Sequence, residues 1–92
     1  MEFEWDVSKE HANIKKHGVT FFEATSSFYD GNGIQLVDKK HSKDERRYYW
    51  VGRSDSGRVL TTWFTKRGSK IRIVGSAEWR KLRRLYEATK NK

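Results

Sequence analysis

Five side chains between residues 41 and 72 have the chemistry that cleavage of a phosphodiester needs. They are His41, Glu45, Arg47, Arg67 and Arg72. Histidine titrates near neutral pH and can act as general base or general acid, and glutamate can act as a base. Arginine is planar and always charged, which suits it to phosphate oxygens. RNA cleavage without a metal needs a base for the 2′-OH, cations on the phosphate, and a proton for the leaving 5′-oxygen.

Two of these residues have equally ordinary structural explanations. His41 falls in a polar, basic loop expected over residues 38–44, where a solvated histidine needs no function. Glu45 can simply form an ion pair with Arg47 or with a residue across the sheet. The residue types alone therefore leave open whether the site is catalytic.

The arginines depend on strand geometry. If positions 45, 47 and 49 share one face of a strand, Glu45, Arg47 and Tyr49 point the same way. Arg72 lies on the polar face of its own expected strand, which alternates apolar and charged residues. Arg67 falls in an expected turn, where solvation is the default.

A metal or other cofactor is not expected. The chain has no cysteine, so a disulfide or thiolate metal site is excluded. The histidines at positions 11, 17 and 41 lack the spacing of metal ligands. The absence of cysteine suits a reducing cytoplasm. No apolar run approaches the roughly 18 residues of a membrane span, and the N-terminus is acidic rather than signal-like. We therefore expect a soluble, cytoplasmic protein with a single domain over residues 1–92.

Charge is distributed unevenly along the chain. The net charge is +8, with a balance of −2 over residues 1–40 and +10 over residues 41–92. A basic half of this strength predicts attraction to a polyanion such as a nucleic acid, although a solvated basic surface is the simpler alternative. The residues that we expect to contact RNA outside the five above are Lys16, His17, Tyr49, Lys70, Arg80, Arg83 and Arg84.

Local signals place these residues on a sheet flanked by helices. Gly18 is a typical C-cap for a first helix, and Thr20 with Glu23 has the spacing of a reciprocal capping box for a second. Trp79 and Tyr86 belong to the expected apolar stripe of the last helix and are predicted to be core residues rather than base-stacking platforms. Lys16 and His17 also have a structural explanation in the last turn of their helix. The expected elements are a strand at 2–6, helices at 8–17 and 20–28, strands at 34–37, 47–53, 59–65 and 70–74, and a helix at 77–89.

The order β-α-α-β-β-β-β-α, with tight turns joining the last three strands, predicts an α+β fold with a largely antiparallel sheet. Over nearly its whole length the chain also resembles the BrnT-type ribonuclease toxins. The matching motifs are F-E-W-D-x-x-K at 3–9, K-H-G-V-x-F at 16–21, H-S-x-x-E-x-R at 41–47, G-R-S at 52–54, G-R-x-L at 57–60, F-T-x-R-G at 64–68 and R-I-V at 72–74.

The resemblance implies a RelE-like fold and an endoribonuclease toxin of a type II toxin–antitoxin system. Its partner would be a cognate antitoxin, often a ribbon-helix-helix protein like BrnA, and the complex would bind operator DNA. Many relatives follow the last strand with S-A-R, whereas this chain has Gly75-Ser76-Ala77, so a role for that arginine has no match here. The alternative is a module without catalysis, which binds nucleic acid or acts with an antitoxin at an operator.

Overall fold

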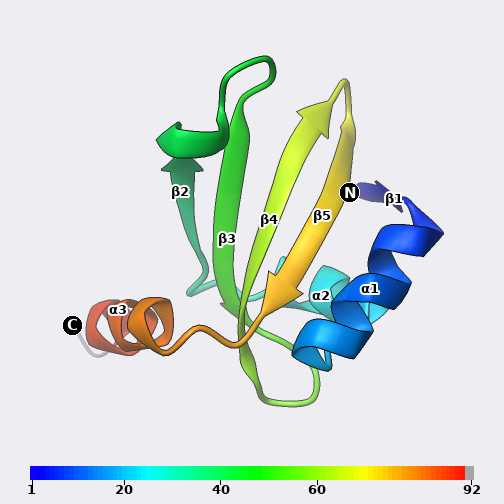
Figure 1. Cartoon of the computed structure of the whole chain (residues 1–92). Coiled ribbons are helices and arrows are strands. Elements are labelled where there is room, and N and C mark those ends of the chain that lie inside the picture. The colour runs from blue at the N-terminus through cyan, green and yellow to red at the C-terminus, as the bar shows by residue number, and fades with distance from the viewer. Residues whose placement is uncertain (91–92) are drawn as a thin grey trace.

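The computed structural model describes residues 1–90, which form one five-stranded sheet and three α-helices (Figure 1). The order along the chain confirms the predicted α+β class. The elements are β1 (Glu2–Trp5), α1 (Val7–His17), α2 (Phe21–Ser27), β2 (Ile34–Asp38), the short 3₁₀ helix η1 (Lys39–His41), β3 (Arg47–Arg53), β4 (Val59–Arg67), β5 (Lys70–Ala77) and α3 (Arg80–Lys90). No helix among residues 1–90 is long and apolar enough to span a membrane.

The sheet has the strand order β1-β5-β4-β3-β2. β1 pairs with β5 in parallel, and the other neighbours are antiparallel. The tight turns predicted this for the β3–β4 and β4–β5 pairs. Gly68 lies in the β4–β5 turn with a φ of 61°, a conformation that side chains with a Cβ rarely adopt. This topology puts the start of β3, the end of β4 and the start of β5 at the same end of the sheet, at the top of Figure 1.

One face of the sheet, here called the core face, is covered by α2. Phe21 and Ala24 of α2, whose i, i+3 spacing puts them on one side of the helix, are fully buried against Ile73 of β5. Phe3 and Trp5 of β1 pack at the margin of this cluster. The alternation of apolar and acidic residues in β1 therefore serves the core on one side only.

The opposite face, here called the site face, is covered only in part. Tyr86 of α3 packs against Val51 and Val59, with Leu82 at the margin of that cluster. These contacts lie toward the end of β3 that carries Arg53, whereas the end that carries Arg47 has no helix over it (Figure 1). The half of the site face that lies toward the β2–β3 connection and the β4–β5 turn, here called the hairpin ends, is therefore not covered by an α-helix (Figure 1).

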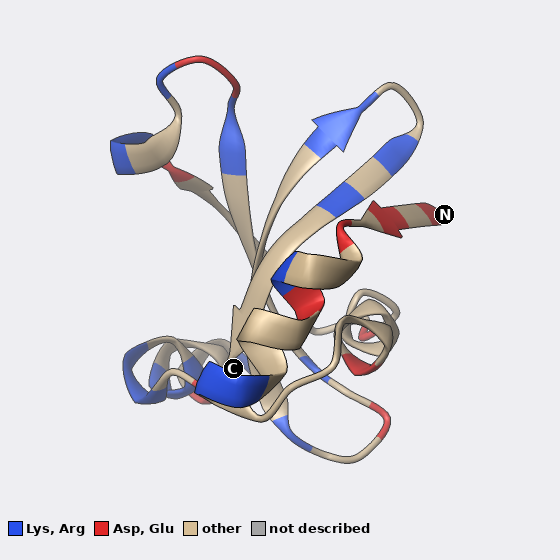
Figure 2. Ribbon diagram, turned by 45° about the vertical axis from the view of Figure 1, so that its right-hand side comes forward, with Lys and Arg blue, Asp and Glu red and all other residues tan. Residues whose placement is uncertain are grey.

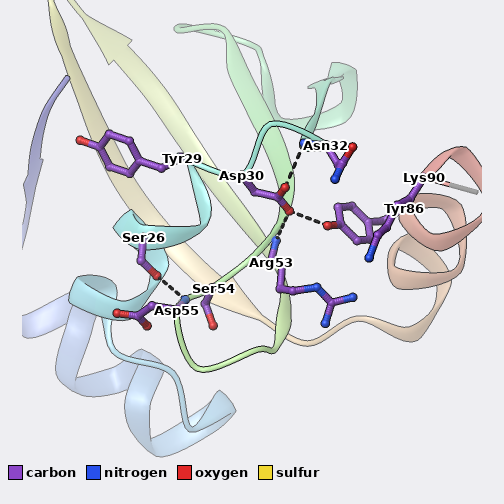
Figure 3. A pocket seen from close by; sticks show the side chains of 9 residues that line it. All are labelled: Ser26, Tyr29, Asp30, Asn32, Arg53, Ser54, Asp55, Tyr86 and Lys90. Carbon is purple, nitrogen blue, oxygen red and sulfur yellow. Dashed lines mark hydrogen bonds between the residues drawn. The ribbon is translucent and has the colours of Figure 1, made fainter.

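A polar cluster anchors α3 to the sheet. The hydroxyl of Tyr86 donates to Asp30, which also accepts from the backbone N–H of Arg53 at 2.8 Å and of Asn32 at 2.9 Å (Figure 3). These groups line a hollow of about 330 Å³ at the Arg53 end of β3. Since Asp30 is already held by three donors, the cluster is explained as the joint that positions α3.

The reciprocal capping box predicted for α2 is half correct. Thr20 caps the helix by accepting from the N–H of Glu23 at 3.0 Å. The carboxylate of Glu23 does not reach back, because it accepts instead from the guanidinium of Arg58, with Nε at 3.1 Å, and from the hydroxyls of Ser54 and Ser56. A tertiary ion pair therefore replaces the local bond and ties α2 to the β3–β4 turn.

The last helix begins later than predicted. β5 continues to Ala77, which pairs with Thr61, so the chain reaches α3 only at Arg80. Trp79 therefore precedes the helix instead of joining its apolar stripe. Tyr86 is buried as predicted, whereas its neighbour Leu85 is 40% exposed.

Candidate active site

The strand register aligns five polar residues in one row across the site face. From one sheet edge to the other they are Asp38, Arg47, Thr65, Arg72 and Glu4, each the pairing partner of the next. Successive strands lie about 4.8 Å apart, which puts the two arginines roughly 10 Å apart at their Cα atoms with the threonine between them. The row alternates acid, cation, hydroxyl, cation and acid.

The centre of this row has unused hydrogen-bonding capacity. Nε of Arg47 and the hydroxyl of Thr65 are buried and have no hydrogen-bond partner, and they are the only such side-chain atoms among the described residues. A buried polar group without a partner costs about 1–3 kcal/mol, so such groups are rare and point to a missing ligand or to function. Sequence reasoning did not select Thr65 as a candidate site residue, because it is one of many β-branched residues in its strand.

His41 is oriented by an aspartate. It ends η1, and its Nδ1 lies 2.9 Å from one carboxylate oxygen of Asp38 and 3.1 Å from the other. Asp38, only 5% exposed, also accepts from the backbone N–H of His41 at 3.3 Å. Burial opposes ionisation of Asp38, but these hydrogen bonds outweigh it and keep its pKa below the usual value. Asp38 was assigned to a loop, although its spacing of three from His41 is that of a capping residue.

Arg67 and Glu45 form a bidentate ion pair at the hairpin end. Nε and Nη2 of Arg67 lie 2.7 and 3.0 Å from the two oxygens of Glu45. The hydrogen bonds from Arg67 lower the pKa of Glu45, and the charges of Arg72 and Arg47 lower it further. The ion-pair alternative for Glu45 is thus realised, with Arg67 as the partner. Arg67 belongs to β4 and not to the turn, which corrects the sequence assignment.

Arg72 is also paired. Its Nη1 donates to Glu4 at 2.9 Å, and Lys70 lies 3.9 Å from the same carboxylate. As predicted, Arg47 and Tyr49 share one strand face, whereas Glu45 precedes β3. The five residues first considered for chemistry therefore gather at the uncovered half of the site face.

A hollow of about 210 Å³ adjoins the row and is lined by Asp38, His41, Arg47, Tyr49, Trp63 and Trp79. This is smaller than the roughly 300 Å³ of a typical small-molecule pocket and suits one group of a longer ligand. Four of the remaining candidate RNA contacts line neighbouring hollows. Lys16 and His17 line a second hollow next to Trp63, Arg80 and Arg83 line a third next to Trp79, and Arg84 is exposed elsewhere on α3.

The charged side chains around the site are mostly cations. Figure 2 shows Lys and Arg at both hairpin ends and along α3, and Asp and Glu on β1. No group of three or more His, Asp or Glu side chains in residues 1–90 is arranged to hold a metal ion. The described site is therefore built from cations, one histidine and carboxylates paired with them.

Comparisons with known proteins give a consistent result. The sequence model of the family described as "Ribonuclease toxin, BrnT, of type II toxin-antitoxin system" matches residues 5–82. The crystal structure of the Brucella abortus ribonuclease toxin BrnT superimposes with a TM-score of 0.63 at 21% identity, covering 86% of this chain and 96% of that one. At this identity the structural likeness shows the fold. No curated protein sequence matched.

Proposed function

The chain belongs to the BrnT family of ribonuclease toxins of type II toxin–antitoxin systems, and on this premise we propose that it cleaves RNA without a metal, by attack of the 2′-OH, at the row centred on Arg47 and Thr65. The observation that carries the proposal is the pair of buried, unpartnered groups at the centre of that row, Nε of Arg47 and the hydroxyl of Thr65. Both are hydrogen-bond donors, and because both are covered in the free protein, the side chains over the row must shift for a phosphate oxygen to reach them.

The scissile phosphate binds over Thr65, between the two arginines of the row. Arg47 and Arg72 flank Thr65 on the neighbouring strands, so their guanidinium groups reach the phosphate from two sides. Charge-assisted hydrogen bonds from arginine are strongest when the phosphorane carries its extra negative charge. The arginines thus stabilise the transition state more than the substrate.

His41 is the group that moves the proton. Donation from Nδ1–H to Asp38 leaves Nε2 as the free acceptor, since a neutral imidazole carries one proton. Nε2 takes the proton of the 2′-OH, the 2′-oxygen bonds to phosphorus, and the bond from phosphorus to the 5′-oxygen breaks. The products are a 2′,3′-cyclic phosphate and a 5′-hydroxyl, whose proton comes from water in the open hollow.

Glu45 acts by holding Arg67 and is not the base. Its lowered pKa means that the carboxylate is ionised and committed to a bidentate pair, which makes it a weak proton acceptor. This choice between His41 and Glu45 was open from the sequence alone.

The family description implies an antitoxin and an RNA substrate. We propose further that the antitoxin is an acidic ribbon-helix-helix protein that covers the basic site face, and that only the complex binds operator DNA. The basic balance of residues 41–92 supports this, because an acidic partner would neutralise the surface that RNA needs.

The test is RNA cleavage by antitoxin-free protein in EDTA, with His41→Ala and Arg72→Ala beside the wild type. We expect wild-type cleavage with 2′,3′-cyclic phosphate ends and a loss of at least about 100-fold in the His41 variant, the scale of general acid–base catalysis. His11→Ala, an exposed histidine on α1, is the matched control and should keep full activity.

Folding of each variant is checked by its thermal midpoint. Intact RNA after incubation with folded wild-type protein would refute catalysis and leave the binding module. Cleavage that EDTA abolishes would refute the metal-free mechanism. Retained cleavage by His41→Ala would refute the assignment of the base.

A further inference from the structure

An aromatic group lies beside the row and is not explained by the core. The indole of Trp79 stacks on that of Trp63, with ring centroids 5.0 Å apart and planes 14° apart. Tyr49 meets Trp79 edge-on at 5.8 Å, and His17 meets Trp63 edge-on at 5.9 Å. Two neighbours thus fix the plane of Trp79 before any ligand arrives.

Trp79 keeps an open surface. It is 37% exposed, although tryptophan is among the most apolar side chains that a protein can bury. Trp63 stacks on one of its faces and Tyr49 contacts it at an angle of 71°, and the side chain still keeps this exposed area. The anchoring of α3 does not need this exposure, since Tyr86 and Leu82 make the contacts to the sheet.

The position of Trp79 links the candidate site to a basic surface. It lines the hollow of about 210 Å³ that contains His41 and Arg47, and also a neighbouring hollow of about 280 Å³ lined by Glu78, Arg80 and Arg83. The chain bends there from β5 into α3, which places an indole with guanidinium groups one and four residues later. A nucleotide presents the same combination, a flat base and a charged phosphate.

We propose that Trp79 is a stacking platform for the base of a nucleotide next to the scissile phosphate in single-stranded RNA, with Arg80 and Arg83 on that nucleotide's phosphate. This rests on the proposed function for the location of the scissile phosphate. The base must be unpaired, because stacking on a side chain needs a base face that a duplex hides. Stacking tolerates any base and favours purines, whose rings are larger.

Binding to an oligonucleotide that cannot be cleaved tests the platform apart from catalysis. The probe is a 2′-deoxy adenine octamer, which lacks the attacking hydroxyl, compared with an abasic octamer of the same length. The variants are Trp79→Leu and Trp79→Phe. Phe22→Leu is the matched control, since Phe22 is a 73% exposed aromatic on α2, away from the site face.

We expect Trp79→Leu to bind the adenine octamer roughly 5- to 150-fold more weakly, the range for loss of one stacked base. Trp79→Phe and Phe22→Leu should stay within about threefold of the wild type, because a phenyl ring still stacks. The abasic octamer should bind all four proteins alike. Bound adenine octamer should quench tryptophan fluorescence in the wild type and clearly less in Trp79→Phe.

Equal affinity of Trp79→Leu and wild type for the adenine octamer would overturn the platform. An equal loss of affinity for the abasic octamer would also overturn it, because Trp79 would then support binding without contacting a base. RNA cleavage in EDTA is measured separately on the same samples. If the protein cleaves RNA but its binding does not depend on Trp79, only the stacking platform is rejected. If binding depends on Trp79 but no RNA is cleaved, only the catalytic function is rejected.

Discussion

Replacing Asp38 with asparagine isolates the electrostatic part of the His41–Asp38 pair. Asparagine keeps the side-chain oxygen that accepts from the backbone N–H of His41, and it is as good a capping residue as aspartate. The change removes the negative charge and replaces the second oxygen, which lies 2.9 Å from Nδ1, with an amide NH2. The turn of η1 should therefore survive the substitution.

The expected loss follows from the bonds to Nδ1. A hydrogen bond to a charged group contributes about 1.5–3 kcal/mol. If Asp38 exerts that stabilisation on the imidazolium that forms in the transition state, its loss lowers the rate roughly 10- to 150-fold. The effect should appear in kcat with little change in KM, because the neutral imidazole of the ground state gains less from the carboxylate.

The assay is a double-mutant cycle on cleavage in EDTA, with Asp38→Asn, His41→Ala and the pair. If Asp38 acts through His41, the aspartate substitution has no further effect once His41 is gone. Fully additive losses in the cycle would refute this reasoning, because Asp38 would then act on the substrate or on the fold. A rise in KM or a fall in thermal midpoint that accounts for the whole loss would refute it equally.

Two further outcomes follow from single side chains. Thr65→Val should leave the free energy of unfolding unchanged or raise it by about 1 kcal/mol, because the buried hydroxyl has no hydrogen-bond partner to lose. The same substitution should lower the rate of cleavage roughly 2- to 10-fold. A large loss of stability in denaturant unfolding would contradict the absence of a partner for this hydroxyl. The guanidinium of Arg58 lowers the pKa of Glu23 from 4.5 to about 2; two serine hydroxyls help, and partial burial opposes the shift. The ionised Glu23 therefore adds about 3 kcal/mol at most to the free energy of unfolding. This stabilisation is present above pH 4.5 and is lost as the pH falls toward 2. Unfolding measured from pH 7 to 2 should show this loss in the wild type and a flatter profile in Glu23→Gln.

The sequence predicted the elements that local chemistry specifies. The end of α1 at Gly18, with a left-handed φ of 68°, and the buried stripe of α2 follow from residue type and spacing. Strand β3 has the predicted bounds, Arg47–Arg53, because charged and turn residues flank its apolar run. These features need no knowledge of distant parts of the chain.

Long-range contacts explain the errors. Glu23 has the spacing of a capping box, but Arg58, 35 residues later, offers a charged partner that the N–H of Thr20 cannot match. β5 pairs with β4 as far as Ala77, where the partner is Thr61, and this pairing delays α3 and leaves Trp79 outside it. Neither partner is visible in a local window of sequence.

The candidate site divides in the same way. Residue type was enough to select His41 and the three arginines, because few side chains can handle protons or bind phosphate. Asp38 and Thr65 are common residues, and only the alignment of β2, β3 and β4 gives them a place in the row. Sequence reasoning thus selected the groups that we propose to react and missed Asp38 and Thr65, which the structure places beside them.

The arginines of the site differ in what binding a phosphate costs them. Arg67 and Arg72 already have carboxylate partners, Glu45 and Glu4, and these pairs are 30–51% exposed. Exposed ion pairs contribute only about 0–1 kcal/mol, so exchanging a carboxylate for a phosphate is nearly neutral, and the carboxylates serve to keep both cations in place without RNA. Nε of Arg47 has no partner to give up, so a phosphate that binds there removes the free-energy cost of a buried donor without a hydrogen bond. In the proposed reaction, the net free energy of phosphate binding is therefore concentrated on Arg47, which pairs with Thr65 in the row and lines the same hollow as His41, the proposed base.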